Sequence, residues 1–235
     1  MSSDKLATIR NLLDTAESYA QNGNADAAES YRNKAMALMA KHGVEEAMLS
    51  ARTHRDEAPI TREVELPKPY AVDKGGLLYR VARALGVRAV RITGPYPRSI
   101  LVGFESDIER VELLYTSLLV QAFGELGTLD PGPYNRTSFN KAWLLGFSVR
   151  VGQRLEEAEA RARGEYDAEN GGPGTALVIR DRAQRVSAAY AEQFPGAKSS
   201  RRKVGNGVGY LRGKEAGERA DIGAKHVRNR RPELV

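Results

Sequence analysis

The chain offers few residues whose types and spacing could support catalysis or metal binding. It contains no cysteine, which excludes disulfides, thiolate metal sites and a thiol nucleophile. Its histidines, His42, His54 and His226, are far apart, and none has a second histidine three to five residues away, as a helical zinc site requires. Carboxylate pairs occur on charged helical faces or at predicted helix starts. The sequence therefore predicts no catalytic residues, no metal and no cofactor, and it favours a non-enzymatic protein.

The glycine-rich residues 205–209 come nearest to a phosphate-binding loop. A lysine followed by serine or threonine would complete such a loop, but here Lys214 is followed by Glu215. The segment also follows a basic polar stretch and not a predicted strand. Both features that would support nucleotide binding are missing, so we predict a structural turn at this position.

Three arginines on a predicted β-hairpin could contact nucleic acid. Residues 87–93 and 98–104 have the composition of strands, and the residues between them are typical of a turn. Arg88, Arg91 and Arg98 would then lie near one ribbon tip. A two-stranded ribbon can enter the major groove of DNA, where arginine pairs with guanine edges. The alternative is an exposed sheet edge that charge protects from further pairing.

The second basic region is the C-terminal segment, residues 196–235. It contains 11 basic and 4 acidic residues, a net charge of +7, so the first 195 residues carry −1 of the total of +6. A localised basic block suits a polyanion better than a diffuse surplus does, and a solvated tail is the alternative. The residues expected to contact phosphates there are Lys198, Arg201, Arg202, Lys203, Arg228, Arg230 and Arg231.

The elements that must position these residues begin with two helices. Apolar residues recur at three- and four-residue steps over 6–20 and again over 28–38, which predicts an αα-hairpin. His42 and Gly43 are predicted to end the second helix. Residues 44–49 could add a short third helix, and the polar, unperiodic residues 51–59 are typical of a linker.

A mixed core is predicted behind this linker. Residues 60–66 form a further strand, and a fourth, buried strand is predicted over 176–179. The first of two long helices is expected to start at a capping box over Ser106, Asp107, Ile108 and Glu109. Asp181 is expected to cap a later helix.

The second long helix, which is predicted to start near Ser138, carries a stripe of large apolar side chains. Phe139, Trp143 and Phe147 share one face, so Trp143 is predicted to be buried. Glycine weakens a helix by about 1 kcal/mol relative to alanine, so Gly146 predicts a close packing partner. Beyond Leu155 the helix is alternately charged, which predicts a solvated extension.

These patterns predict an α+β fold that is mainly helical. An N-terminal αα-hairpin is followed by a small sheet of three to four strands, packed with two long helices, and by a basic, glycine-rich C-terminal segment. The predicted domains are a hairpin over 1–50, a linker over 51–59 and a core over 60–195. The segment 196–235 is expected to pack partly on the core through the small face of Gly213, Ala216, Gly217 and Ala220.

Two stretches carry motifs that are similar to a known family. The first combines residues 5–13 with residues 38–43, and the second combines residues 101–107 with Ser138, Phe139, Gly146 and Phe147. The first stretch resembles an uncharacterised N-terminal helical-hairpin family of bacterial and phage proteins, and the second resembles its companion α+β core domain. The resemblance implies an accessory protein of actinobacterial phages or mobile elements, some of which resemble factors that redirect a serine integrase in DNA recombination. It supplies no reaction and no catalytic residues.

The leading hypothesis is a non-enzymatic accessory protein that binds DNA, RNA or a nucleoprotein partner, with the hairpin docking a protein and the basic segment adding affinity for the polyanion. One alternative is a protein–protein regulator of a host or phage enzyme that makes no nucleic-acid contact. Another is a hydrolase whose site is assembled from scattered carboxylates. Because no run of about 18 apolar residues occurs and the N-terminus lacks the apolar part of a signal peptide, we expect a cytoplasmic protein with no membrane contact.

Overall fold

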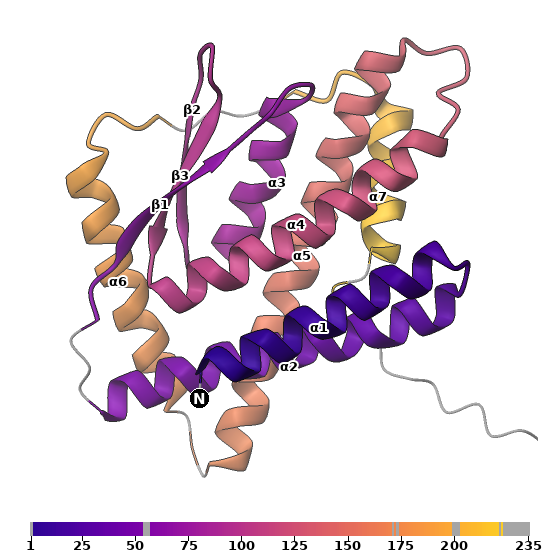
Figure 1. Ribbon diagram of the computed structural model, residues 1–235. Coiled ribbons are helices and arrows are strands. Elements are labelled where there is room, and N and C mark those ends of the chain that lie inside the picture. The colour runs from indigo at the N-terminus through magenta and orange to yellow at the C-terminus, as the bar shows by residue number, and fades with distance from the viewer. Residues whose placement is uncertain are drawn as a thin grey trace, which may run out of the picture.

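The computed structural model describes residues 2–53, 57–170, 172, 174–198, 203–220 and 222. It confirms an α+β fold that is mainly helical (Figure 1). The elements are, in chain order, α1 (Ser2–Gln21), α2 (Ala25–Arg52), β1 (Ile60–Glu65), α3 (Ala71–Ala84), β2 (Arg88–Ile92), β3 (Arg98–Gly103), α4 (Glu105–Thr128), α5 (Arg136–Glu169), α6 (Thr175–Gln193) and α7 (Gly207–Arg219).

The strands form one antiparallel sheet in the order β1-β3-β2. At one end of the sheet Ile60 lies opposite Gly103, and Arg88 lies opposite Val102. Side chains alternate between the two faces of a sheet, so Leu101 and its strand neighbours two residues away share one face. That face is buried beneath α3 and α4, and α6 covers the opposite face (Figure 1). The predicted β2–β3 hairpin is therefore confirmed.

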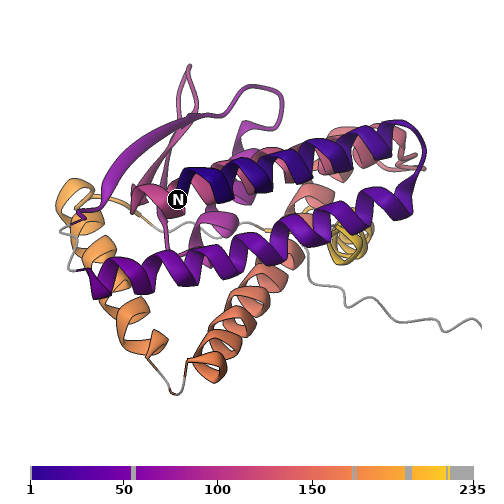
Figure 2. The ribbon, with the colours of Figure 1, turned by 60° about the horizontal axis from the view of Figure 1, so that its bottom comes forward.

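The N-terminal hairpin packs against the rest of the molecule. Figure 2 shows α1 and α2 side by side across the front of the structure. Asn24 caps α2 by accepting a hydrogen bond from the backbone N–H of Ala27 at 3.1 Å. Ile9 and Leu13 of α1 belong to the same hydrophobic cluster as the residues of α3, α4 and α5. The inner stripe of the hairpin thus contributes directly to the main core.

Helix α2 does not end at Gly43, and residues 44–49 are not a separate helix. The helix continues to Arg52, and Gly43 lies in its interior. A β-carbon at Gly43 would overlap the guanidinium group of Arg110 in α4. The glycine is therefore explained by the space that a distant side chain needs, and the prediction of a helix end was wrong.

Residues 176–179 are helical, so the predicted fourth strand is wrong. They form the first turn of α6, which begins at Thr175. The side chain of Asp167 accepts hydrogen bonds from the backbone N–H of Thr175 at 3.1 Å and from its hydroxyl at 2.8 Å, which holds the start of the helix. Leu177 is 63% exposed, so this short apolar run does not enter a sheet. Asp181 lies inside the helix and does not cap it.

The predicted capping box of α4 is also wrong. The helix starts at Glu105, and its cap residue Phe104 makes no side-chain cap hydrogen bond. Ser106 and Asp107 are therefore already helical. The carboxylate of Asp107 bonds instead to arginines of the protein interior, as the next subsection describes.

The aromatic stripe of α5 lies at the centre of the core. Trp143 and Phe139 have no solvent-exposed surface, and the rings of Trp143 and Phe147 stack with centroids 5.2 Å apart. A β-carbon at Gly146 would overlap the backbone carbonyl of Tyr210 in α7. Both the burial of Trp143 and the close packing partner of Gly146 are confirmed.

Helix α7 lies backbone to backbone against α5. Positions Gly209, Gly213 and Gly217 face the carbonyls of Phe139, Trp143 and Phe147, in that order; a β-carbon would lie 2.7 Å from the first oxygen and 2.8 Å from the third, and would overlap the second. Both series advance by four residues together, so the two helices run in the same direction. The predicted small face of the C-terminal segment is confirmed as a helix-packing surface.

Candidate functional site

The three arginines of the β2–β3 hairpin do not converge on one surface. The pairing register puts Arg88 and Arg98 on one face of the sheet and Arg91 on the other. Arg88 lies at the end of β2 far from the hairpin tip, with its guanidinium 4.9 Å from the ring centroid of Tyr190 in α6. Arg98 forms an ion pair with Glu63 at 3.0 Å. Arg91 and Arg98 do lie near the ribbon tip, but on opposite faces, so the prediction that all three arginines gather there is wrong for Arg88.

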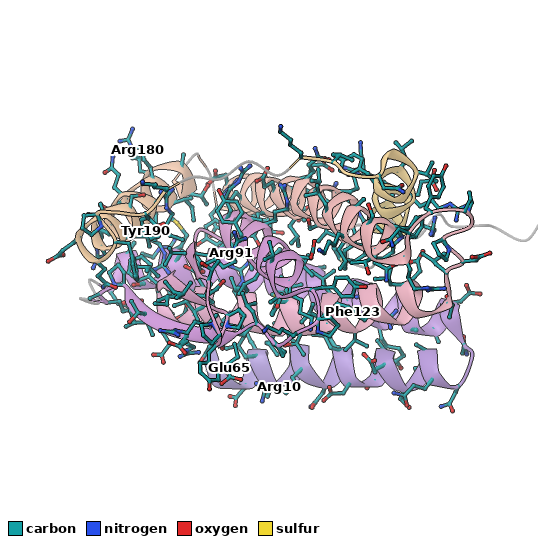
Figure 3. All side chains as sticks on the ribbon, turned by 90° about the horizontal axis from the view of Figure 1, so that it is seen from above. Arg10, Glu65, Arg91, Phe123, Arg180 and Tyr190 are labelled. Atoms are coloured by element: carbon teal, nitrogen blue, oxygen red, sulfur yellow. The ribbon has the colours of Figure 1, made fainter. Side chains whose placement is uncertain are left out.

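The C-terminal basic residues that the structure describes lie on the side of the molecule away from α1. Lys198 and Lys203 are exposed within the connection from α6 to α7, and neither forms an ion pair with a described residue. In Figure 3 this connection runs along the edge where Arg180 points outward, and Arg10 of α1 lies at the opposite edge. The other predicted contacts, Arg201, Arg202, Arg228, Arg230 and Arg231, lie outside the described residues.

A pair of arginines on α3 adds basic character that the sequence patterns did not reveal. Arg80 packs against Gly152 of α5, and burial, with the nearby charge of Arg83, lowers the pKa of Arg80. Arg83 pairs with Glu156 at 2.6 Å, and this hydrogen bond raises the pKa of Arg83. Arg80 has no ion pair with any residue in the described ranges, although the charge of Glu156 acts on its guanidinium.

Charged side chains of α4, α5 and α6 form a network in the interior. Arg110 of α4 donates to Glu159 of α5 and, at 3.3 Å, to Asp107, which also accepts a 2.8 Å bond from Arg182 of α6. Burial raises the pKa of Glu159, and the charge of Arg110 opposes that shift. Because the network ties α4, α5 and α6 together, its role is structural. The prediction of a solvated extension of α5 is wrong at Glu159, which is only 8% exposed.

His42 lies next to this network and not at a helix end. It is 2% exposed in the interior of α2, and burial lowers the pKa of its imidazole, with Arg110 and Lys5 acting in the same direction. Glu46 and Glu45 oppose the shift. The neutral ring therefore packs as a core side chain.

An open groove of about 1090 Å³ lies between α1, α4 and the start of β1, and we call it the α1–α4 groove. Its apolar lining comes from all three elements: Leu6, Ala7, Leu13, Ala58, Ile60, Leu113 and Val120. Its acidic lining is equally large: Asp14, Glu17, Glu46, Glu57, Glu105, Glu109 and Glu112. Only two lining residues are basic, Arg10 and Arg62. The α1–α4 groove therefore combines apolar surface with an excess of acidic side chains.

Each wall of the groove is one face of a helix. On α1 the lining residues recur at three- and four-residue steps from Leu6 to Glu17, and on α4 they recur in the same way from Glu105 to Val120. At about 1.5 Å per residue the walls are roughly 16 and 22 Å long. Figure 1 shows α1 and α4 running in roughly the same direction, so the groove is elongated.

The acidic residues of the groove are only partly neutralised. Arg62 bridges Glu105 at 3.3 Å and Glu112 at 3.0 Å, and Glu57 lies 3.9 Å from Arg182 of α6. Asp14, Glu17 and Glu109 form no ion pair with any residue that the structure describes. The unpaired carboxylates come from both walls, so an occupant of the groove would meet negative charge on two sides.

The sequence patterns did not reveal this groove because its walls are about a hundred positions apart in the chain. The polar residues of α1 follow its apolar stripe at helical spacing, which is also the pattern of an ordinary solvated face. The polar face of α4 was not evident in the sequence, because apolar residues around Leu113 and Leu119 make this helix look apolar on nearly all sides. The acidic excess of each helix was the one signal that could have indicated it.

No family model matches the chain, and no curated protein or solved structure was found to match it. The family resemblance of the two sequence stretches therefore stays a prediction. In the part of the chain that the structure describes, no group of three or more His, Cys, Asp or Glu residues is arranged to hold a metal ion. Nor does any helix there have the length and apolarity needed to span a membrane.

Proposed function

We propose that this protein is a non-enzymatic accessory protein that binds nucleic acid or a nucleoprotein partner through its basic C-terminal segment. The role in phage or mobile-element biology, including the redirection of a recombinase, belongs to the same proposal. The observation that supports the proposal most is that positive and negative charge are separated, both along the sequence and between two sides of the folded molecule.

The charge separation is visible at two levels. Residues 196–235 hold a net charge of +7 while the rest of the chain is close to neutral. In space, the connection from α6 to α7, which carries the exposed Lys198 and Lys203, runs along the edge opposite α1 (Figure 3), whereas α1 forms one wall of the acidic α1–α4 groove. A phosphate backbone approaching the basic edge therefore avoids the region of strongest repulsion.

The geometry favours phosphate contacts over base recognition by the hairpin. Arg88 and Arg98 already contact Tyr190 and Glu63, and Arg91 lies on the opposite face of the sheet. A ribbon reading the major groove needs its arginines on one side. Contacts to phosphates do not require the cations to match base edges, and the C-terminal segment provides cations by composition.

The test is the salt dependence of duplex DNA binding by the full chain. Each phosphate contact contributes a slope of about 0.9 log units of affinity per log unit of salt, so replacing Arg201, Arg202 and Lys203 with glutamine should weaken binding and flatten the slope by up to about 3. The matched control replaces Arg52, Lys68 and Arg161 with glutamine, which changes the net charge equally at exposed positions elsewhere. Equal effects of the two variants, or no DNA or RNA affinity of wild type at low salt, would contradict the proposal.

A further inference from the structure

We infer that the α1–α4 groove docks a basic, amphipathic helical segment of a partner protein. This inference does not depend on the nucleic-acid function, because it rests on another surface and on opposite charge. It follows from three properties of the groove: its apolar lining, its uncompensated carboxylates and its length.

The apolar lining calls for an apolar stripe in the occupant. Leu6, Ile60 and Leu113 are only partly buried, and Val120 remains 47% exposed at the rim. Covering such surface stabilises a complex by about 25 cal/mol for each Å² removed from water. A fully polar occupant, such as a nucleic-acid backbone, would leave this contribution unused.

The carboxylates require the rest of the occupant to be basic. Seven acidic residues face two arginines in the lining, and Arg62 is already engaged with Glu105 and Glu112. Asp14 and Glu17 on one wall and Glu109 on the other are left without a cation among the described residues. Lysines or arginines flanking an apolar stripe would meet these carboxylates on both sides, and the same field repels acidic partners and nucleic acid.

The shape selects a helix. Two roughly parallel helical walls about 16 to 22 Å long match a helix of roughly 11 to 15 residues, at 1.5 Å per residue. A helix with apolar residues at i, i+3, i+4 and i+7 presents a stripe of this kind to a groove. A helix bound there would lie between α1 and α4, whose side chains line the groove.

The probe for the experiment is a designed peptide of about 15 residues, labelled with fluorescein, with leucines on one helical face and lysines on the other. We expect the full-length protein to bind it at low salt and to bind two control peptides much more weakly. One control has glutamate in place of lysine, and the other has the same composition in an order without a helical stripe. Equal binding of the scrambled peptide would overturn the inference of an amphipathic helix.

The groove is tested by a matched pair of charge reversals. Asp14, Glu17 and Glu109 changed together to lysine should weaken peptide binding about tenfold or more, because each lost attraction becomes a repulsion. The control changes Glu165, Asp181 and Glu192 to lysine; all three are exposed, lie outside the groove and have no ion pair with a described residue. Circular dichroism and thermal unfolding establish that both variants fold. Equal weakening by the two variants would mean general charge attraction, and would overturn the site.

A second pair tests the apolar contribution without changing the acidic residues. Val120→Asn, in the groove lining, should reduce peptide affinity, and Leu177→Asn, at a more exposed leucine of α6, should not. Duplex DNA binding should survive both substitutions, so a failure here is distinguishable from a failure of the nucleic-acid function.

Two further outcomes would assign the groove to another occupant and so overturn the partner-protein inference. If replacing Arg228, Arg230 and Arg231 with glutamine in the full chain raises peptide affinity, the chain's own C-terminal segment competes for the groove. If sedimentation shows self-association that the Asp14, Glu17 and Glu109 reversal abolishes, a second copy occupies it. Unchanged peptide affinity and a monomeric wild type support the inference.

Discussion

Two pairs of neighbouring helices in this molecule are built in opposite ways. Where α5 meets α7, glycines allow the two backbones to touch, and Trp143 fills the space beside them without any exposed surface. Where α1 faces α4, leucines and carboxylates line an open groove of about 1090 Å³. Small residues thus allow close packing in the first pair, and larger and charged residues line the space in the second.

This difference separates stability from binding. The backbones of α5 and α7 already pack against each other. At the end of α7, Arg154 donates hydrogen bonds to the carbonyl oxygens of Gly217, at 2.8 Å, and Ala220. The α1–α4 groove instead keeps partly exposed apolar groups and unpaired charges, which are features of an interaction surface. Substitutions should therefore affect unfolding at the first pair and ligand binding at the second.

The largest expected effect is at Trp143. Trp143→Ala should lower the free energy of unfolding by about 3–5 kcal/mol, because it leaves a cavity in the core beside Phe147. Val120→Ala, in the groove, should lower it by less than about 1 kcal/mol, because that side chain is 47% exposed. Chemical denaturation of both variants checks the pair. A small loss at Trp143, together with solvent-exposed tryptophan fluorescence in wild type, would contradict the closed packing.

The next effect distinguishes two glycines that are both inside helices. Gly213→Ala should lower the free energy of unfolding by about 1–3 kcal/mol, because the new methyl group meets the carbonyl of Trp143. Gly164→Ala should raise it by up to about 1 kcal/mol, because nothing lies within 4 Å of that position and alanine favours the helix. The two changes are chemically identical, so opposite signs isolate the contact. The same sign at both positions would mean that α7 does not pack this closely.

The sequence predicted these elements unevenly, for physical reasons. The stripe of Phe139, Trp143 and Phe147 and the small face of α7 were predicted correctly, because helical periodicity and residue size are local properties. Gly43 was misread as a helix end because its true partner, Arg110, is distant in the chain. A four-residue apolar run such as 176–179 fits a strand or a helix equally well, and only the Asp167 cap decides between them.

The functional surfaces were harder to predict than the core. Basic residues can be counted along the chain, but whether Arg88, Arg91 and Arg98 meet depends on strand register, which places them on two faces. The α1–α4 groove depends on two helices that are brought together only by the folded core. Glu159 resembled a solvated residue in sequence because its buried partner lies on another helix.

The smallest expected effect is a pH dependence at His42. Burial lowers the pKa of His42 in the folded state. The unfolded chain therefore takes up the proton first as pH falls below about 6.5, and the stability contributed by the neutral ring is lost over that range. The free energy of unfolding of wild type should fall more between pH 7.5 and pH 5 than that of His42→Gln. These pH values lie about one unit or more on either side of the ordinary histidine pKa. A proton NMR titration that gives His42 an ordinary or raised pKa would contradict this.

The most direct measurement of the central claim is a crossed binding experiment on the full chain. Labelled duplex DNA and the labelled basic peptide are titrated against wild type, the groove variant (Asp14, Glu17 and Glu109 to lysine) and the tail variant (Arg201, Arg202 and Lys203 to glutamine). The groove variant is expected to lose the peptide and keep the DNA, and the tail variant is expected to lose DNA affinity and keep the peptide. Loss of both ligands from one variant, or binding of neither ligand by wild type at low salt, would contradict this claim.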